Sequence, residues 1–436
     1  MDERLAPGTK LVSDAGLAIV VDTFLGGGGQ GDVYRVDTPD GVRALKYYHP
    51  HTSSAAQHEN LRQLASIGFD DPRFMWPLDT VSGPSGRRYG YIMDLRPDGW
   101  ATIPDLLARR AAGTTLRSLY RIGVHLASGY RALHAQGMAY RDINWGNVFF
   151  HPPDGQILIC DNDNALFGNA EAAVRGTSKF MAPEVFRNEA SPSAQTDLHS
   201  LAVLLFMIFV NGHPLDGALE AAEMCLDDEA EARLYGTSPV FIYDPADKSN
   251  RPQPGIHDAV IALWPTLPSE LQQLFSRSFT EGLHTPSKRV TEGEWAKVLT
   301  RMHDRIFRCA DCGKHNVFDK KLFEQTGVAG SCWSCQRPLI KPPMLTADNH
   351  ELVLEPDARI FSHHIRAVAE PTFDEPIAEL VAHPAKPGRY GLRNVGSASW
   401  TKLAPDGSTV GVEPGQTARI SSDLVLEING IRFEIG

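Results

Sequence analysis

Three polar residues in the middle of the chain have the types and spacing that phosphoryl transfer needs. Asp142 and Asn147 lie in the segment Ala139-Tyr140-Arg141-Asp142-Ile143-Asn144-Trp145-Gly146-Asn147, and Asp161 follows at the end of an apolar run. One carboxylate can orient a hydroxyl group, while Asn147 and Asp161 can supply oxygen ligands to Mg²⁺. The chemistry that this set supports is transfer of a phosphoryl group from a metal-bound nucleotide.

A glycine-rich segment near the N-terminus is expected to contact the phosphates. Residues 17–48 alternate apolar runs with the cluster Gly26-Gly27-Gly28-Gly29-Gln30-Gly31, which predicts a strand, a tight loop, a strand, a turn at Asp40-Gly41 and a further strand. Glycines let backbone N–H groups approach phosphate oxygens closely. A flexible hairpin is the alternative; a dinucleotide-binding unit is disfavoured because a strand, not a helix, follows the last glycine.

Lys46 is the cation expected on the strand after this loop, within reach of the phosphates. Such a lysine must be held by a carboxylate, and Glu59 is the only acidic residue between Tyr47 and Phe69. The residues around Glu59, 52–65, have an apolar helical face and hydroxyl groups suited to an N-cap. The sequence therefore predicts a helix whose Glu59 pairs with Lys46.

Residues 17–305 resemble the eukaryotic-type (Hanks-type) serine/threonine protein kinase fold. The resemblance rests on the joint order of several motifs, none of which would be specific alone. They are the glycine loop, Lys46, Glu59, Tyr140-Arg141-Asp142 with Asn147, Asp161-Asn162-Asp163, Gly176-Thr177 with Met181-Ala182-Pro183-Glu184, Asp197, and Pro286-Ser287-Lys288-Arg289.

The resemblance implies a role for each matching residue. Asp142 would orient the substrate hydroxyl, Asn147 and Asp161 would bind Mg²⁺, and Lys46 held by Glu59 would position the phosphates. It also implies a Glu184–Arg289 ion pair and an Asp197 that braces the catalytic loop. The residues expected to bind ATP are Gly26, Gly28, Gly31, Val33, Ala44, Lys46, Met93, Asp94 and Leu95. The alternative for Asp142 and Asn147 is a capped turn, because both residue types favour turns.

Three positions depart from the family pattern. Tyr140 replaces a histidine that mostly packs, which is a small change. Asn162-Asp163 replace Phe-Gly after the metal ligand, so we expect a segment less able to leave its active arrangement. Asn144 replaces the lysine that neutralises the γ-phosphate, and losing such a cation costs on the order of a few kcal/mol of transition-state stabilisation. Arg175 or Lys179 is the candidate to supply the missing charge.

The segment between Asp161 and Gly176 contains no Ser, Thr or Tyr. Arg141 is the residue that would grip a phosphate placed there. The sequence therefore predicts no phosphorylation switch at the usual site, with Glu171 as a permanent partner of Arg141. Two functions stay open at this point: an active serine/threonine kinase, slowed by Asn144, and a nucleotide-binding pseudokinase that acts as a scaffold.

Four cysteines form two pairs, Cys309-Ala-Asp-Cys312 and Cys332-Trp-Ser-Cys335. Two C-x-x-C pairs at this separation are typical of tetrahedral thiolate ligation of Zn²⁺, and four cysteine ligands leave no open position for catalysis. Disulfides are the rival interpretation, and the absence of an export signal in the sequence disfavours them. We expect a structural zinc ribbon.

Short alternating strands follow Lys341-Pro342-Pro343, with turns at Asp406-Gly407, Pro414-Gly415 and Asn429-Gly430, and predict a small β-sandwich. This region resembles a forkhead-associated phosphothreonine-binding domain, with Ser362-His363-His364-Ile365 in the place of the binding loop. No clear phosphate-gripping Arg accompanies that loop, and a plain docking module is the favoured alternative.

The expected fold class is multidomain α+β. A bilobal protein kinase fold would cover 1–305 (N-lobe about 1–95, C-lobe about 96–305), a four-cysteine zinc ribbon 306–338, and an all-β sandwich 339–436. This order resembles the kinases of bacterial tellurite-resistance-associated (TerY-type) phosphorylation triads. That resemblance implies a von Willebrand A-type protein and a PP2C-type phosphatase as partners.

Composition narrows the partners and the compartment. The chain of 436 residues has a formal net charge of −11, which argues against non-specific binding to nucleic acid or to anionic lipid. Its N-terminus lacks the apolar region of a signal peptide, and its most apolar run, 201–210, is about half the ~20 residues that a membrane span needs. We therefore expect a cytoplasmic protein with a protein or nucleotide partner. Small-molecule kinases of related fold usually lack Ala182-Pro183-Glu184 and the preceding Gly176-Thr177, so the resemblance favours a protein substrate that carries Ser or Thr.

Overall fold

The computed structural model describes residues 4–83, 88–167, 176–347, 350–404 and 406–436. The chain divides into two compact units, and each is described by itself. The first comprises Met1–Thr114, Gly129–Arg251 and Ser278–Arg289, and the second comprises Thr115–Ser128, Pro252–Arg277 and Val290–Gly436. The units divide the chain at places other than the predicted domain boundaries at 305 and 338, which stay predictions.

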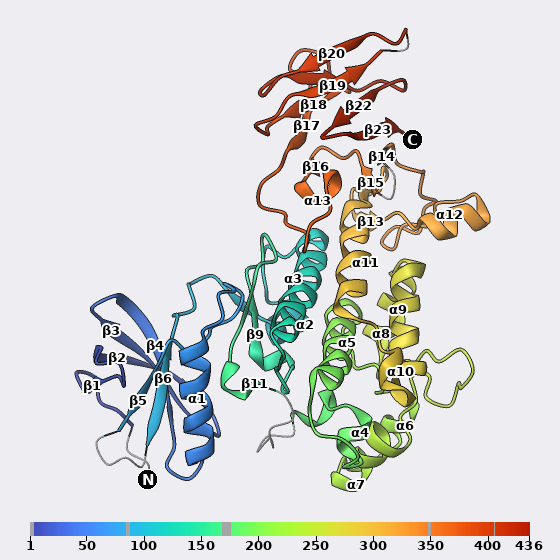
Figure 1. Ribbon diagram of the computed structural model, residues 1–436. Coiled ribbons are helices and arrows are strands. Elements are labelled where there is room, and N and C mark those ends of the chain that lie inside the picture. Colours follow the sequence, from blue (N-terminus) through green and yellow to red (C-terminus); the bar gives the residue numbers. More distant parts are fainter. Residues whose placement is uncertain (1–3, 84–87, 168–175, 348–349, 405) are drawn as a thin grey trace. The chain divides into compact units, whose positions relative to one another are not determined.

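A six-stranded antiparallel sheet begins the first unit (Figure 1). The strands across the sheet are β1 (Lys10–Val12), β2 (Ala18–Gly27), β3 (Gly31–Thr38), β4 (Gly41–Tyr48), β6 (Tyr89–Met93) and β5 (Asp79–Ser82). The hydrogen bond from Gly28 N–H to Gly31 O closes the loop between β2 and β3. The strands, glycine loop and turn predicted for 17–48 are confirmed.

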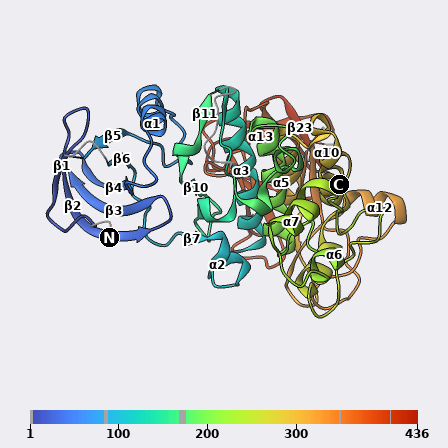
Figure 2. The same cartoon turned by 90° about the horizontal axis from the view of Figure 1, so that it is seen from below.

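Helix α1 (Ala55–Ile67) lies alongside this sheet (Figures 1 and 2). Its N-cap is Ser54, whose hydroxyl accepts the Gln57 N–H at 3.1 Å, as the N-cap prediction required. Leu61 and Leu64 are fully buried, and Leu61 packs against the tyrosines of β4 and β6. These two leucines set the rotation of α1 and therefore decide which of its side chains face the rest of the unit.

The rest of the first unit is mainly helical, with short strand pairs that carry the turns of the site. Among the helices that lie entirely within this unit, the longest is α5 (Ala194–Val210). Every residue from Thr196 to Val210 is buried. This is the buried helix predicted for the most apolar run. The other elements are β7 (Ala101–Thr102), α2 (Ile103–Leu107), β8 (Met138–Ala139), β9 (Val148–Phe150), β10 (Ile157–Ile159), β11 (Leu166–Phe167), α4 (Pro183–Phe186), α6 (Ala218–Ala221), α7 (Asp228–Glu231) and α10 (Glu281–His284).

Two helices of the described residues cross the division between the units, and further helices lie in the second unit. The crossing helices are α3 (Leu116–Ala135) and α9 (Ser269–Phe279); α8 (Asp258–Leu263) and α11 (Glu292–Asp304) belong to the second unit. Across the described parts of the chain, no helix combines the length and the apolar character needed to cross a membrane.

The second unit continues from α11 into a cysteine-containing hairpin and two further sheets. The hairpin is β12 (Ile306–Arg308) with β13 (His315–Val317), and α12 (Lys320–Thr326) follows. A six-stranded sheet runs in the order β15 (His350–Val353), β14 (Met344–Ala347), β23 (Ile431–Ile435), β22 (Val425–Ile428), β19 (Trp400–Leu403) and β20 (Thr409–Val412). A four-stranded sheet runs in the order β16 (Arg359–Ile360), β17 (Ala378–Ala382), β18 (Tyr390–Asn394) and β21 (Thr417–Arg419).

Both of these sheets contribute to one buried apolar cluster. Leu345 and Phe433 come from the six-stranded sheet, Leu380 and Leu392 come from the four-stranded sheet, and all four side chains are buried in the same core. Two antiparallel sheets around one shared core are what the alternating pattern after Pro343 predicted.

A buried carboxylate joins α11 to α13 (Ser362–Ile365) in the second unit. Asp304 Oδ1 lies 3.1 Å from His303 Nδ1, and Asp304 Oδ2 lies 3.0 Å from His364 Nε2. His303 Nε2 accepts from Arg121, and His364 Nδ1 accepts the Phe361 N–H at 2.9 Å. Both imidazoles are thus neutral tautomers that donate to Asp304. A metal ion in this cluster would have to displace the proton on His364 Nε2, so the contacts favour a hydrogen-bonded structural joint.

The structure corrects the proposed phosphopeptide loop. Ser362-His363-His364-Ile365 form the short helix α13, and His363 and His364 are buried. Side chains that pack inside the unit cannot grip a peptide on its surface. The histidines that the resemblance to a forkhead-associated domain placed in the binding loop are therefore not accessible to a phosphopeptide.

We predict that acid destabilises the second unit through His363. Burial lowers the pKa of His363 to about 3, whereas an unfolded histidine keeps a pKa of about 6.5. Below about pH 6.5 the unfolded chain takes up a proton that the folded chain does not. Stability is therefore present above that pH and is lost as the pH falls toward 3, by up to about 1.4 kcal/mol for each pH unit.

Urea unfolding of the wild type and of His363→Phe at pH 7 and pH 5 measures this effect. Neither ring nitrogen of His363 has a hydrogen-bond partner among the described residues, so phenylalanine removes the titration without breaking a bond. Between the two pH values the wild type should lose about 2 kcal/mol more than the variant. Equal losses in the two proteins would contradict the assignment.

Candidate active site

The turn that carries Asp142 is held by a buried carboxylate of α5. Asp197 is 1% exposed, and its two oxygens accept the backbone N–H groups of Tyr140 at 2.7 Å and Arg141 at 2.9 Å. His134 Nε2 lies 3.0 Å from the same carboxylate. Arg141 has a φ of 73°, a conformation that costs a non-glycine residue roughly 1 kcal/mol or more. The prediction that Asp197 braces the catalytic loop is confirmed.

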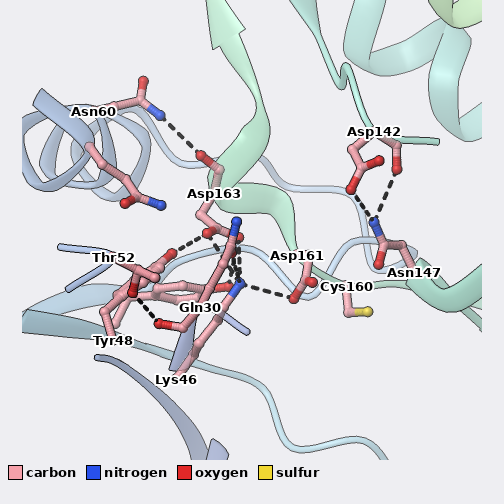
Figure 3. A network of polar contacts seen from close by, with 12 residues as sticks. Gln30, Lys46, Tyr48, Thr52, Asn60, Asp142, Asn147, Cys160, Asp161 and Asp163 are labelled. Carbon is pink, nitrogen blue, oxygen red and sulfur yellow. Dashed lines mark hydrogen bonds and ion pairs between the residues drawn. The ribbon is translucent and has the colours of Figure 1, made fainter. Parts of the chain in front are cut away.

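Asp142 is surrounded by donors that orient its carboxylate. Thr177 donates its backbone N–H and its hydroxyl to Asp142 Oδ1, at 3.0 and 2.8 Å. Asn147 Nδ2 donates to Asp142 O at 3.0 Å and to Oδ2 at 3.3 Å (Figure 3). Burial raises the pKa of Asp142 above its ordinary value, and the hydrogen bonds from Thr177, Asn144 and Asn147 oppose that rise. The carboxylate is held in one orientation with its ionised form supported.

Tyr140 and Asn144, two of the departures from the family pattern, have structural roles. Tyr140 is fully buried and its hydroxyl donates to Cys160 O, so it packs, as expected. Asn144 caps the 3-10 turn Trp145–Asn147: its Oδ1 accepts the Gly146 N–H at 2.7 Å, and its Nδ2 donates to Asp142 O at 3.0 Å. Asn144 therefore stabilises the loop but supplies no charge to it.

Lys46 is a buried cation held by two carboxylates and a loop amide. Its Nζ lies 3.2 Å from Asp161 Oδ1, 3.2 Å from both oxygens of Asp163, and 3.3 Å from Gln30 Oε1 of the glycine loop (Figure 3). Burial disfavours the charged form, but Asp163 and Asp161 outweigh burial and the pKa of Lys46 is raised. The ammonium group is therefore permanently charged.

The expectation that Glu59 holds Lys46 is not met. Glu59 is exposed on α1, and the ion pairs of Lys46 among the described residues are with Asp161 and Asp163. The reason is helical phase: Glu59 lies two positions before the buried Leu61, which places it on nearly the opposite side of the helix. Asn60 instead faces the segment that follows Asp161 and donates to Asp163 O and Ala165 O, both at 3.2 Å.

The segment from Asp161 to Asn164 is a tight turn with one strained residue. Asp161 has φ 54° and ψ 41°, in the left-handed region, and the 3-10 turn Asn162–Asn164 follows. Asn162 is fully buried and donates to Ile159 O at 2.9 Å. Tyr48 and Tyr91 both donate to the Asp163 carboxylate, at 3.3 Å for Tyr91. The sequence did not lead us to expect a contact between Asp163 and Lys46. A signal was present, because Asp163 directly follows Asn162, which stands where the family pattern has phenylalanine.

The glycines of the loop differ in what they permit. A Cβ on Gly31 would lie 2.6 Å from Tyr47 O, so this glycine is required for the close approach of β3 to β4. Gly26 and Gly28 have no heavy atom of the described residues within 4 Å of their Cβ positions. A side chain at either position would therefore meet open space, so these two glycines are not required by packing against the described residues.

The expected adenine-binding side chains come together in one apolar cluster. Ala44 and Met93 are buried and are paired across β4 and β6, and Val33 and Leu95 pack against the same cluster. Leu158 and Cys160 also pack against this cluster, although no sequence pattern predicted them there. Asp94 follows β6 at the surface, where its carboxylate lies 3.7 Å from Arg43.

Lys179 and Arg175 were the candidates to supply the charge that Asn144 lacks. Lys179 donates to Asp216 Oδ2 at 2.6 Å and lies over the ring of Tyr235, so its charge is engaged away from Asp142. Ser178 donates to Glu231. Arg175 and Glu171 lie outside the described residues.

An ion pair at the end of the activation segment is confirmed. Arg289 donates to both oxygens of Glu184, at 2.8 and 2.7 Å, and both residues are buried. This bidentate geometry is the strongest form of the carboxylate–guanidinium contact. It fixes α4, which follows Thr177, to the segment that precedes α11.

The four expected metal-binding cysteines lie together in the second unit. One sulfur atom from each of Cys309, Cys312, Cys332 and Cys335 lies within 4.8 Å of the others, with Sγ–Sγ distances of 3.7 Å for 309–335 and 3.6 Å for 312–332. These distances are too long for disulfides, whose S–S bond is about 2.05 Å. Asn316 donates to Cys332 Sγ at 3.5 Å, a contact that sequence reasoning missed. The cluster could hold a tetrahedral metal ion.

Comparison with known proteins agrees with this site. Residues 89–298 match the family described as protein kinase domain. CBL-interacting protein kinase 4 of Oryza sativa subsp. japonica is 32% identical over 157 residues, which is 34% of this chain and 33% of the relative. Human serine/threonine-protein kinase H2 is 30% identical over 128 residues, 28% of this chain and 30% of the relative. The chain thus spans about a third of the length of these curated relatives.

Among solved structures, the kinase domain of Mycobacterium tuberculosis PknI aligns with a TM-score of 0.46 at 19% identity, over 68% of this chain and 99% of that domain. The family match covers Asp142, Asn147 and Asp161, whose contacts are those described above. Residues 89–298 of this chain therefore match the protein kinase domain family, and parts of the chain are similar in sequence to serine/threonine kinases.

Proposed function

We propose that this protein is an ATP- and Mg²⁺-dependent kinase that transfers the γ-phosphoryl group to Ser or Thr of a partner protein. The observation that carries the proposal is the pair of donors on Asp142: Thr177 and Asn147 orient a carboxylate that is ready to accept the proton of a substrate hydroxyl. Two motifs that follow Asp142 in the sequence favour a protein substrate by family resemblance. They are Gly176-Thr177 and Met181-Ala182-Pro183-Glu184.

The metal and nucleotide would be held by groups of suitable chemistry. Asn147 and Asp161 offer amide and carboxylate oxygens, the ligands that Mg²⁺ prefers, and Lys46 offers a fixed charge to the phosphates. When bound, Mg²⁺ neutralises charge that develops on the phosphate oxygens. The apolar cluster of Val33, Ala44 and Met93 is suited to a planar base.

Regulation and partners belong to the proposal as well. The hydroxyl of Thr177 is engaged with Asp142 and that of Ser178 with Glu231, which supports a kinase that needs no phosphate at the usual site. The resemblance to TerY-type triads, through the domain order and Asp161-Asn162-Asp163, supports a von Willebrand A-type or PP2C-type protein as partner. Co-purification of the tagged chain with each protein class, compared with an Asp142→Asn chain as bait, tests that pairing.

We predict that Asp142→Asn lowers phosphotransfer by at least about a hundredfold and leaves nucleotide affinity nearly unchanged, because the substitution removes the proton acceptor but keeps its shape. Radiolabelled γ-phosphate transfer to a partner protein and calorimetric titration with Mg·ADP give the two numbers. A wild type that binds Mg·ADP but transfers no phosphate in an Asp142-dependent manner would establish the alternative, a pseudokinase scaffold.

We predict that Thr177→Val moves the acid limb of the kcat/KM profile to higher pH. Burial already raises the pKa of Asp142, and the variant loses the hydroxyl bond that favours the ionised form. The shift should be about one pH unit, the effect of one hydrogen bond to a charged group. Thr177→Ser keeps the hydroxyl and should restore the wild-type limb. An unshifted limb in the valine variant would show that this bond does not tune Asp142.

We also propose that the four cysteines bind one structural Zn²⁺. The four sulfur atoms within 4.8 Å of one another supply the donor set that tetrahedral Zn²⁺ requires and leave no ligand position open. The ion would tie the β12–β13 hairpin to the segment that follows α12. A role in protein contact is favoured over nucleic-acid binding, because Lys314, Lys320, Lys321 and Arg337 are the few cations nearby and Lys320 and Arg337 are paired with acids.

Removal of this metal gives a direct prediction. The purified chain should contain about one zinc ion per molecule by plasma mass spectrometry, and Cys312→Ser should lose it. Because binding free energy is folding free energy at such sites, the variant should also show protease cleavage between 306 and 338. Asp311→Asn, which alters only the surface pair with Arg337, is the matched control and should retain the zinc. A wild-type chain without zinc would refute the assignment.

A further inference from the structure

Lys46 makes its ion pairs with a segment that lies far along the chain, and α1 contributes no carboxylate to them. Lys46 is 5% exposed and Asp163 is 3% exposed, and three oxygens from two aspartates lie 3.2 Å from the ammonium. Glu59 is exposed. The carboxylate that fixes the lysine therefore comes from the turn that also carries the proposed metal ligand Asp161.

Contacts from several elements of the first unit hold the carboxylate of Asp163 in place. Its side chain is fully buried, it accepts from Tyr48 and Tyr91, and it faces Lys46 (Figure 3). Asn60 of α1 donates to the backbone oxygen of the same residue at 3.2 Å. Five hydrogen-bonding contacts from β4, β6 and α1 thus converge on one residue, counting the two from Lys46.

The neighbouring Asp161 cannot have the same role. Its side chain is 39% exposed, and one of its oxygens contacts Lys46. A carboxylate that turns toward a metal ion gives up part of its contact with a lysine, because its lone pairs are shared. Asp163 is buried away from solvent and retains Lys46 in either case.

We propose that Asp163 is the positioning residue for Lys46, and that α1 acts on the lysine only through Asn60 and the backbone of Asp163. The inference rests on the proposed ATP-dependent function. It means that the phosphate-contacting lysine and the metal-binding turn are positioned as one element. A displacement of the exposed face of α1, Glu59 included, leaves that element intact.

Two double-mutant cycles on the full chain test the proposal, one for Lys46 with Asp163 and one for Lys46 with Glu59. The variants are Lys46→Met, Asp163→Asn, Glu59→Gln and the two corresponding doubles. The probe is Mg·ADP in calorimetric titration, with thermal unfolding of each variant alongside. A residue that acts through Lys46 has no further effect once Lys46 is gone.

Asp163→Asn should weaken Mg·ADP binding by about tenfold in the wild-type background and by less than about twofold in the Lys46→Met background. Glu59→Gln should change affinity by less than about twofold in both backgrounds. Asn60→Ala removes the hydrogen bond between α1 and the backbone of Asp163. This variant should weaken Mg·ADP binding by a smaller factor than Asp163→Asn. The opposite pattern, coupling of Lys46 with Glu59 and none with Asp163, would overturn the proposal.

Failure of the proposal and failure of the kinase assignment give different results. A wild type that binds no Mg·ADP overturns the proposed function and this inference with it; a wild type that binds it while both cycles show no coupling overturns this inference alone. If Asp163→Asn does not fold, the Lys46→Met double removes the unpaired buried charge and should fold. A double variant that remains unfolded would show that Asp163 acts independently of Lys46, which also overturns the inference.

Discussion

The buried ammonium group of Lys46 is the constraint on which the site depends. A side chain that is 6% exposed must keep its charge paired, because removing one partner of a buried pair costs roughly 3–5 kcal/mol. Its partner Asp163 lies 117 residues further along the chain. Strand β4 and the turn after β10 therefore cannot separate without leaving a charge unpaired. This one group sets how closely the sheet approaches the turn that carries Asp161 and Asp163.

Both functional turns contain a strained non-glycine residue next to a buried charge. Arg141 has φ 73° and Asp161 has φ 54°. The first is held because Asp197 accepts from the Arg141 N–H, and the second because Asp161 itself contacts Lys46. Residues in this conformation persist only where their surroundings determine them. The buried Asp197 and the buried Lys46 thus perform the same physical task, one at the turn of Asp142 and the other at the turn of Asp161.

Much of this site could be predicted because its signals are local or belong to a shared motif. The glycine loop, the N-cap at Ser54, the Glu184–Arg289 pair and the cysteine pairs all follow from short patterns. The partner of Lys46 could not be predicted in that way, because Asp163 lies 117 residues further along the chain and no local pattern connects the two. The phase of Leu61 and Leu64 was visible in the sequence and already placed Glu59 on the outer face.

The burial of the histidines of α13 could not be predicted from the sequence, for a different reason. A histidine is compatible with a surface loop or with a core, and nothing near Ser362-His363-His364 distinguishes the two. The decision comes from Asp304, which lies 60 residues before His364 and forms a hydrogen bond with it, and from Phe373, whose ring packs against His363. Long-range packing of this kind leaves no periodic signal in a single sequence.

The Asp161-Asn162-Asp163 segment separates two tasks that one carboxylate could not combine. A metal ligand must be accessible and able to turn, whereas the partner of a buried lysine must stay in place. The side chain of Asp161 is 39% exposed and the side chain of Asp163 is 0% exposed. If Asp161 were the only anion near Lys46, each binding of a metal ion would weaken the contact that fixes the lysine. With Asp163 two residues later, Asp161 can move while the lysine remains paired.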